Sequence, residues 1–388
     1  MGARGGCRSL ERAPDRAVQL IPIDFERRFR TMPSKPIQVL FAPDYREGVP
    51  YQSLLADALA HRGASVRFLE GYKRVLPLSR LLDQQKCDIL HLHWPEAYYA
   101  RRQDGFDLFR TVRFPFDLHR ATQKAVLVTT AHNFLAHDRA VELLIARNVR
   151  YANRKSRMVF AHSLGAQEKL IQAFDLDPSL VRVIPHGDLS VAMRPPVSQA
   201  EARHQLGLGD GKIALMFGAV KPYKGVEDVI AWWKQARPAA TLAIVGKPAS
   251  DAYATHLSRA VGDTPQILTR FEFLSDDALG LWLSAADAVI SNYREILTSG
   301  AASLARSWGV PLLLPRRLST IDLDEPTPYV RRFTDFATDF RTELDAALAL
   351  QPDFAAAAAW REACSWDRIA ELTMDGYRSA MGHRQCAA

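Results

Sequence analysis

The chain has 388 residues, of which 48% are hydrophobic and 24% are charged. This balance is typical of a globular protein and excludes wholesale disorder and collagen, and the length divides most simply into two domains of about 100–200 residues each. The formal net charge of +7 suggests an anionic partner, without saying whether that partner is a nucleotide, a lipid head group or a nucleic acid.

The spacing of the cysteines and the length of the apolar runs indicate the cellular compartment. The four cysteines are scattered without a C-x-x-C pair, so neither a disulfide framework nor a zinc site is supported. The N-terminal segment lacks the apolar stretch of a secretion signal, and no uninterrupted apolar run reaches the ~18 residues of a membrane span. We therefore expect a cytoplasmic protein.

Strands and helices alternate from residue 37 onward. Residues 1–35 are rich in Arg, Gly and Pro and lack a persistent period, which predicts a poorly ordered extension. Residues 36–195 contain short apolar runs separated by amphipathic stretches, the pattern of a parallel sheet covered on both faces. The predicted strands here are 37–43, 65–70, 87–94, 125–132, 158–163 and 181–187, and the predicted helices are 53–63, 79–85 and 139–153.

The same pattern restarts after a connector at residues 195–212, which is rich in proline and glycine. The predicted strands of this second series are 212–220, 241–247, 266–273, 287–293 and 310–315, with helices at 227–235 and 276–285. Residues 354–388 complete the chain as a helix. The expected α/β fold is two doubly wound, Rossmann-like domains, residues 36–195 and 196–353, which face each other across a cleft.

Two strand ends of the first domain carry candidates for proton transfer. In LHLHWPE, alternation places His91 and His93 on one face, but no third residue has the spacing of a metal ligand. Glu96 in the same segment can act as a general base or bind a sugar hydroxyl, and a solvated loop carboxylate is the alternative. In AHNFLAHD, His132 can accept a proton and Asp138 follows it; a buried structural histidine and a helix cap are the alternatives.

The segment FGAVKPYKGVEDV opens the second domain and is the most informative part of the chain. Gly218 ends a strand, and Lys221 and Lys224 bracket a turn before a helix. Backbone donors at a helix start together with two ammonium groups suit a diphosphate, whereas a solvated lysine pair is the alternative. No G-x-x-x-x-G-K-[ST] motif is present, which argues against a P-loop ATPase.

A second anion site is predicted in SNYREILTSG. Glu295 follows a strand, and Thr298, Ser299 and Gly300 offer hydroxyl and backbone donors at a helix start. The alternative is a capping turn with Ser299 as the N-cap, and the two interpretations are compatible.

Taken in order, LHLHWPE, AHN, PHG, FGAVKPYKGVE, IVGKPA and LTSGAASLA resemble the GT-B glycosyltransferases, and within them the xanthan-type bacterial exopolysaccharide β-mannosyltransferases. The resemblance covers roughly residues 37–377. It implies transfer of mannose from GDP-mannose, with inversion, to a polyprenyl-diphosphate-linked glycan, without a metal or other cofactor. Retaining GT-B enzymes usually carry E-x7-E; here Ser303 stands eight positions after Glu295, which favours the inverting subgroup.

The resemblance also implies roles for the site residues. Lys221, Lys224 and the helix start at residues 298–300 would neutralise the leaving diphosphate, and Glu295 would contact the donor. The base would come from the first domain, with His132 and Glu96 ranked above Asp138. The full expected donor-binding set is Gly218, Lys221, Lys224, Glu295, Thr298, Ser299, Gly300 and His186.

A basic and aromatic segment at residues 101–120 predicts the acceptor side. Arginines interleaved with phenylalanines suit contact with an anionic membrane, here the inner face of the plasma membrane, and a core helix with outward arginines is the alternative. The expected contact residues are Arg101, Arg102, Phe109, Arg110 and Arg113.

Other functions stay open at this point. No basic stripe repeats along one helix, which argues against nucleic acid as the partner. Transfer from a UDP- or dTDP-hexose and a non-catalytic nucleotide-sugar-binding regulator are the remaining alternatives.

Overall fold

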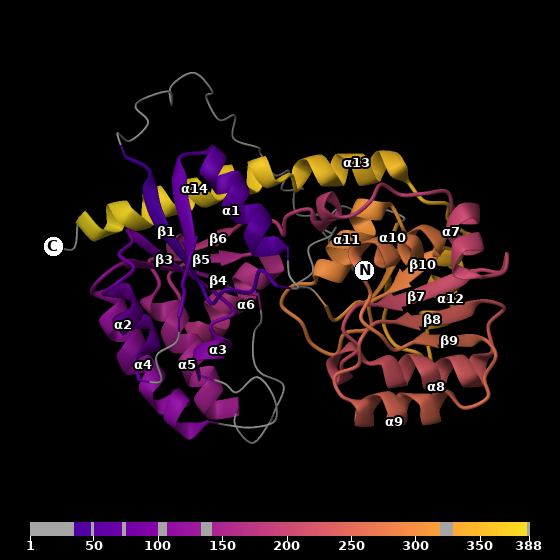
Figure 1. Cartoon of the computed structure of the whole chain (residues 1–388). Helices are drawn as coiled ribbons and strands as arrows, with labels where there is room; N and C mark the ends of the chain where they lie inside the picture. Colours follow the sequence, from indigo (N-terminus) through magenta and orange to yellow (C-terminus); the bar gives the residue numbers. More distant parts are fainter. Residues whose placement is uncertain are drawn as a thin grey trace, which may run out of the picture. The chain divides into compact units, whose positions relative to one another are not determined.

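The structure is a computed structural model that describes residues 35–47, 50–71, 75–99, 107–132, 142–318 and 329–385. These residues form two six-stranded parallel sheets with helices on both faces of each (Figure 1). The predicted α/β fold with two doubly wound units is therefore confirmed. The predicted extension lies, apart from Lys35, outside the described residues.

The first sheet has the strand order β2-β1-β3-β4-β5-β6. Its side chains alternate between two cores: Val39 and Phe41 pack under helices α1 and α14 (Trp366–Gln385), and Leu40 and Ala42 pack with α2, α4, α5 and α6. Its strands are β1 (Ile37–Ala42), β2 (Ala64–Phe68), β3 (Ile89–His93), β4 (Val126–Thr130), β5 (Met158–Ala161) and β6 (Val181–Val183). Its helices are α1 (Tyr51–His61), α2 (Pro77–Leu82), α3 (Glu96–Tyr99), α4 (Leu108–Thr122), α5 (Glu142–Lys155) and α6 (Leu164–Phe174).

The second sheet has the order β12-β11-β10-β7-β8-β9. Helices α8, α9 and α12 contribute to the core on one face, and α10 and α11 to the core on the other. Its strands are β7 (Ile213–Phe217), β8 (Thr241–Val245), β9 (Ile267–Arg270), β10 (Ala288–Ile290), β11 (Leu312–Pro315) and β12 (Val330–Phe333). Its helices are α7 (Gln199–Leu206), α8 (Val226–Ala236), α9 (Asp251–Val261), α10 (Asp276–Ala285), α11 (Gly300–Trp308) and α12 (Phe340–Ala349).

The structure contains helices that were not predicted, among them α6, α9 and α12, and it also differs in the connector, in strand β12 and in the C-terminal helix. The predicted connector contains helix α7, which begins because the Ser198 side chain caps it by accepting from the backbone N–H of Glu201. Strand β12 was not predicted, because its sequence VRRF is short and half polar. The predicted C-terminal helix is two helices, α13 (Phe354–Ala363) and α14 (Trp366–Gln385).

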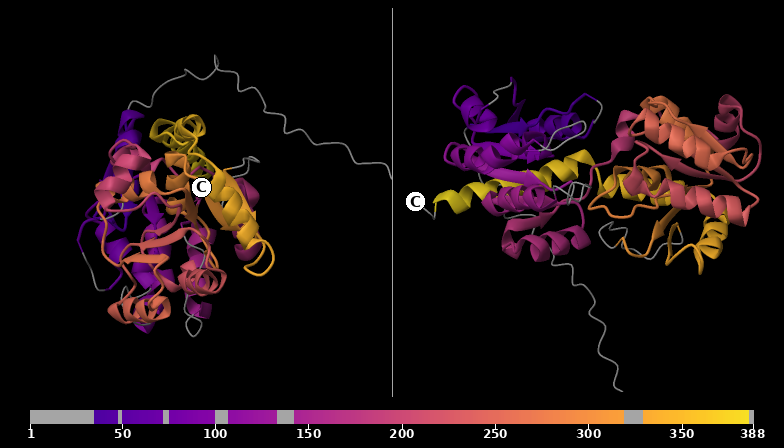
Figure 2. Two further views of the ribbon diagram at one scale, coloured as in Figure 1. Left: turned by 90° about the vertical axis from the view of Figure 1, so that its right-hand side faces the viewer. Right: turned by 90° about the horizontal axis from the view of Figure 1, so that it is seen from below.

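Helices α13 and α14 pack on different parts of the chain. Helix α13 packs on α11, whereas α14 packs on α1, β4 and β5 (Figure 2). Trp366, the first residue of α14, lies against Gly187, where an added Cβ would come within 2.5 Å of the indole ring. Gly187 is therefore required by close packing. Among the described residues, we find no helix with both the length and the apolar character needed to cross a membrane.

Candidate functional site

Four histidines lie in a row at the carboxyl ends of β3, β4, β5 and β6: His93, His132, His162 and His186. Neighbouring rings are 4.9 to 5.6 Å apart between centroids. Tyr51 of α1 covers the row, since its ring contacts all four imidazoles at 5.0 to 5.8 Å. The predicted residues His132 and His186 are thus brought together with two further histidines, and we call the four side chains the histidine row.

Burial keeps the histidine row neutral. It lowers the pKa of all four imidazoles, because the charged form loses its hydration, and in His162 the pKa falls to about 3. For His132 the second cause is repulsion from His162. Each imidazole is therefore uncharged at neutral pH and keeps one nitrogen lone pair as a proton or hydrogen-bond acceptor.

The other two predicted bases are placed differently. Glu96 begins helix α3 and is half-buried. Trp94, two residues before it, stacks on His132 with 3.9 Å between the ring centroids and a 14° interplanar angle. Asp138 lies outside the described residues. The role of each as a base stays a prediction.

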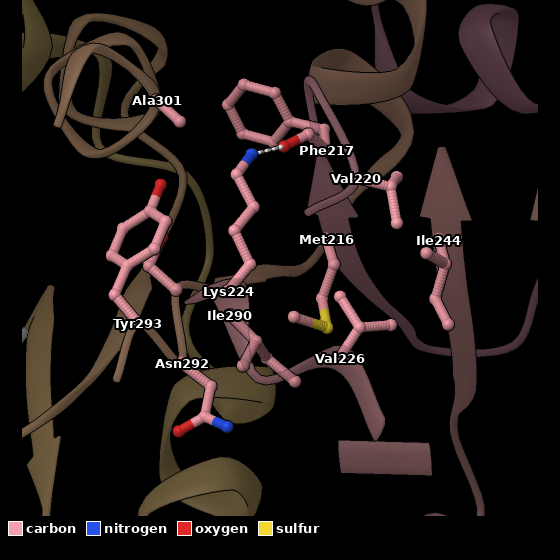
Figure 3. A pocket seen from close by; sticks show the side chains of 11 residues that line it. Met216, Phe217, Val220, Lys224, Val226, Ile244, Ile290, Asn292, Tyr293 and Ala301 are labelled. Atoms are coloured by element: carbon pink, nitrogen blue, oxygen red, sulfur yellow. Dashed lines mark hydrogen bonds between the residues drawn. The ribbon is translucent and has the colours of Figure 1, made fainter. Parts of the chain in front are cut away.

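Of the predicted donor residues, Lys224 lines a narrow pocket of the second unit (Figure 3), whereas the other seven are not among the residues that line it. The ammonium of Lys224 donates to the backbone carbonyl of Phe217 at 2.8 Å and lies over the Tyr293 ring. An added Cβ on Gly218, which has a φ of +81°, would lie 3.3 Å from the Lys224 Nζ atom. Ala301, in the first turn of α11, lines the same pocket.

Charge and position make this pocket suitable for an anion. Burial lowers the pKa of Lys224 to about 8, and the nearby charge of the exposed Lys221 adds to this effect. A bound anion would raise this pKa and favour the charged form. The first backbone N–H groups of α11 lack intrahelical acceptors. The positive end of the helix dipole lies at this same end of the helix, so both features favour an anion there.

The start of α11 confirms the capping alternative for Ser299. Its Oγ accepts from the backbone N–H of Ala302 at 3.1 Å and exchanges a hydrogen bond with the Tyr293 hydroxyl at 2.9 Å. Thr298 precedes the cap and is half-buried. An added Cβ on Gly300 would lie 3.6 Å from the His186 ring, so these two predicted residues are adjacent.

Glu295 makes a contact that was not predicted. Its Oε1 accepts from the ammonium of Lys169, in α6 of the first unit, at 2.7 Å. Both side chains are partly exposed. The contact of Glu295 with a donor stays a prediction.

Helix α4 has apolar side chains on its solvent-exposed face as well as on its buried face. Phe114 and Leu118 are buried in the core. Arg110 pairs with Asp107 at 3.2 Å, and Arg113 lies over the Phe109 ring. Four large apolar side chains of this helix are more than half exposed: Leu108, Phe109, Val112 and Phe116. Arg101 and Arg102 lie outside the described residues.

Within the described ranges, no group of three or more His, Cys, Asp or Glu residues could hold a metal ion. Metal independence stays a prediction. The sequence interpretation missed His162, Tyr51 and Trp366. The signal for His162 was present, because MVFAHS places a polar residue after a buried strand, as LHLHW and AHN do.

Solved structures with this fold include glycosyltransferases. The HepE protein of Anabaena in complex with UDP-glucose is 19% identical, has a TM-score of 0.62, and the match covers 87% of this chain and 98% of that one. Sucrose-phosphate synthase from Thermosynechococcus elongatus is 17% identical, with a TM-score of 0.65 over 91% and 100% of the two chains. The fold is therefore that of the GT-B glycosyltransferases, as predicted.

The sequence relatives are more specific. A GDP-mannose:glycolipid 4-beta-D-mannosyltransferase of Xanthomonas campestris pv. campestris is 26% identical over 344 residues, which span 86% of this chain and 89% of the relative. A protein of the same name from another strain is 25% identical over 69% of each chain. No protein-family profile matches the chain. The fold is that of the GT-B glycosyltransferases, and the predicted resemblance to the xanthan-type enzymes is confirmed by these relatives.

Proposed function

We propose that this glycosyltransferase moves mannose from GDP-mannose, with inversion and without a metal, to a lipid-linked oligosaccharide in exopolysaccharide synthesis. The observation that carries the proposal is the pocket in which Lys224 and the first turn of α11 converge. Support for mannose comes from the names of the two sequence relatives. A UDP-hexose is the second candidate donor, because the HepE structure of the same fold holds UDP-glucose.

The chemistry assigned to the pocket is stabilisation of the leaving group. As the bond between the anomeric carbon and the diphosphate breaks, negative charge grows on the diphosphate oxygens. The Lys224 ammonium and the free N–H groups of α11 are already oriented, so little reorganisation is needed when the charge develops. The acceptor oxygen attacks from the opposite face, and its proton goes to a group of the first unit.

A donor screen tests this function. Purified protein is incubated with GDP-mannose, UDP-glucose and dTDP-glucose, and melting temperature and transfer to a lipid-linked acceptor are measured. We expect stabilisation and transfer with GDP-mannose, and a β-linked product by proton NMR. Turnover with UDP-glucose alone would reassign the donor, an α-linked product would contradict inversion, and binding without transfer would favour the regulator.

Donor affinity should depend on pH through Lys224. With a pKa of about 8 in the free protein, the ammonium is charged below that pH and neutral above it. The dissociation constant for GDP-mannose should therefore be constant from pH 6.5 to 7.5 and rise toward about tenfold per pH unit above pH 8. Isothermal titration calorimetry measures it.

Lys221 supplies the check on this assignment. Its charge contributes to the lowered pKa of Lys224, so Lys221→Ala should raise the pKa of Lys224. The loss of donor affinity should then begin at a higher pH, independently of any change in the affinity at neutral pH. An unchanged onset would show that another group controls the pH dependence.

We also propose that α4 contacts an anionic membrane that carries the acceptor. The exposed row of Leu108, Phe109, Val112 and Phe116 can enter the interface. Arg113 and Arg120 lie over the rings of Phe109 and Phe116 and can meet lipid phosphates.

A flotation assay tests the membrane contact. The protein should float with vesicles of phosphatidylcholine and phosphatidylglycerol and remain in solution with phosphatidylcholine alone. The double variant F109S/F116S should lose flotation. The matched control is Phe273→Ser, since Phe273 is 74% exposed but lies after β9 in the other unit. Equal flotation of the double variant and wild type would refute the role of α4.

A further inference from the structure

Three members of the histidine row are joined by direct hydrogen bonds. His162 Nδ1 lies 2.9 Å from the backbone carbonyl oxygen of Ile184. His162 Nε2 lies 3.2 Å from His132 Nδ1, and His132 Nε2 lies 3.3 Å from His93 Nδ1. The series therefore runs without a gap from a backbone carbonyl, through three imidazoles, to His93.

The backbone carbonyl determines the proton position on every ring of the series. A carbonyl oxygen only accepts, so His162 must carry its proton on Nδ1. Because the ring is neutral, its Nε2 is a bare acceptor, and His132 must donate from Nδ1. Neutral His132 then has a bare acceptor at Nε2, so His93 must donate to it from Nδ1. All three histidines are then Nδ1–H tautomers, and each internal lone pair is occupied.

One lone pair is left at the end of the series. His93 Nε2 is buried and, in the part of the chain that the structure describes, has no hydrogen-bond partner. A buried polar atom without a partner is costly and marks a place where a proton or a donor is expected. His132, by contrast, has both nitrogens engaged and has no free lone pair for a substrate proton.

Backbone strain lies next to this atom. Trp94 follows His93 and has a φ of +47°, in the left-handed region that a bulky residue rarely adopts. This conformation accompanies the stacking of its indole on His132. Such strain persists where the surrounding structure requires it, and it concentrates at functional sites.

We propose that His93, His132 and His162 act as one relay that takes up the proton of the acceptor hydroxyl, with His93 Nε2 as the accepting atom. This inference rests on the proposed glycosyl transfer. The acceptor O–H bond breaks, the acceptor oxygen bonds to the anomeric carbon, and the bond from that carbon to the diphosphate breaks, its electron pair leaving with the diphosphate.

The proton then resides on the relay. The His93 imidazolium donates from Nδ1 to His132 Nε2. The hydrogen bonds from His132 to His162 and from His162 to the Ile184 carbonyl orient His132 and stabilise this charge. His132 and His162 are positioning residues in this scheme, and an acceptor reaches His93 only when the cover formed by Trp94 and Tyr51 is displaced.

Histidine NMR tests the relay without any substrate. Long-range proton–nitrogen correlation spectra of protein labelled with 15N-histidine report which ring nitrogen carries the proton, and variants of single histidines assign the signals. We expect Nδ1–H tautomers for His93, His132 and His162 at neutral pH. An Nε2–H tautomer at any of the three would overturn the relay, while leaving the proposed transferase function intact.

Substitutions of His162 test the link to catalysis. His162→Leu removes the acceptor for His132 Nδ1–H, whereas His162→Gln retains an oxygen that can accept it. We expect kcat to fall by about 10- to 100-fold in the leucine variant, with little change in KM for the donor, and to recover most of this loss in the glutamine variant. Wild-type kcat in the leucine variant, or equal losses in two equally stable variants, would contradict the relay.

A buried histidine outside the relay is the matched control. His91 lies below the histidine row and bonds to Tyr377 and Thr130 instead. His91→Gln should leave the three relay tautomers unchanged, and a change would show that the tautomers respond to general core perturbation. Absence of transfer in the wild-type protein would count against the proposed function, and the tautomers would still be measurable.

Discussion

Replacing Lys224 with alanine should lower the rate of sugar transfer by about 100-fold or more, which is the usual cost of removing one preoriented group that stabilises developing charge. The ammonium lies in the pocket shared with the first turn of α11 and donates to the Phe217 carbonyl. Steady-state transfer at saturating GDP-mannose measures the loss. The free protein should stay folded, because the substitution removes a charge that burial disfavours.

Lys234→Ala is the control for Lys224→Ala. Lys234 lies on α8, a few residues along the chain, and its ammonium likewise donates to a backbone carbonyl, that of Ala260, at 2.7 Å. This variant should transfer sugar at the wild-type rate. Near-normal turnover of Lys224→Ala at saturating donor would refute the phosphate role, and a collapsed melting temperature would show that Lys224 acts on the fold.

Replacing Asp287 with alanine should reduce the free energy of unfolding by about 3–5 kcal/mol, the range seen when one partner of a buried ion pair is removed. Asp287 is 3% exposed. Its carboxylate accepts from Arg203 at 2.7 Å, Lys212 at 2.9 Å and the backbone N–H of Ile213 at 2.7 Å. The alanine variant leaves the buried Arg203 charge and the Ile213 N–H without this partner. Urea unfolding measures the loss.

Two further variants separate the causes. Asp287→Asn retains an oxygen for the Ile213 N–H but loses the charge, so its loss should be smaller than that of alanine. Asp345→Ala breaks a surface pair with Arg341 whose side chains are about half exposed, and it should cost no more than about 1 kcal/mol. Similar losses for Asp345→Ala and Asp287→Ala would contradict the argument from burial.

The strands were the most predictable part of the fold. Eleven were predicted from apolar runs such as IQVLFA and IALMF, because a strand buried on both faces has almost no polar residues. Strand β12 was not predicted, since it has only four residues and its two arginines stand together between Val330 and Phe333. The break between α13 and α14 was also not predicted. It accompanies a tertiary contact, the packing of Trp366 on Gly187, which no local pattern indicates.

The candidate site was predictable in part. Lys224, Gly218 and the start of α11 were all proposed from local motifs. The structure brings Lys224 and Ala301 of α11 to one pocket and places Gly218 beside the Lys224 ammonium. The pairing of Glu295 with Lys169 could not be predicted, because 126 residues separate the two in the chain. His162 had a visible local signal at a strand end, but nothing local indicated its partners.

Sequence alone determined that this protein has two doubly wound units and that polar residues follow their strands, and it predicted that a lysine turn and a serine-capped helix bind phosphate. These features depend on periodicity and on residues near one another in the chain. Only the tertiary structure decided that His93, His132 and His162 form one hydrogen-bonded series ending at Ile184. The physical reason is that strand order sets which strand ends are neighbours, and a tautomer depends on the atom that a neighbour presents.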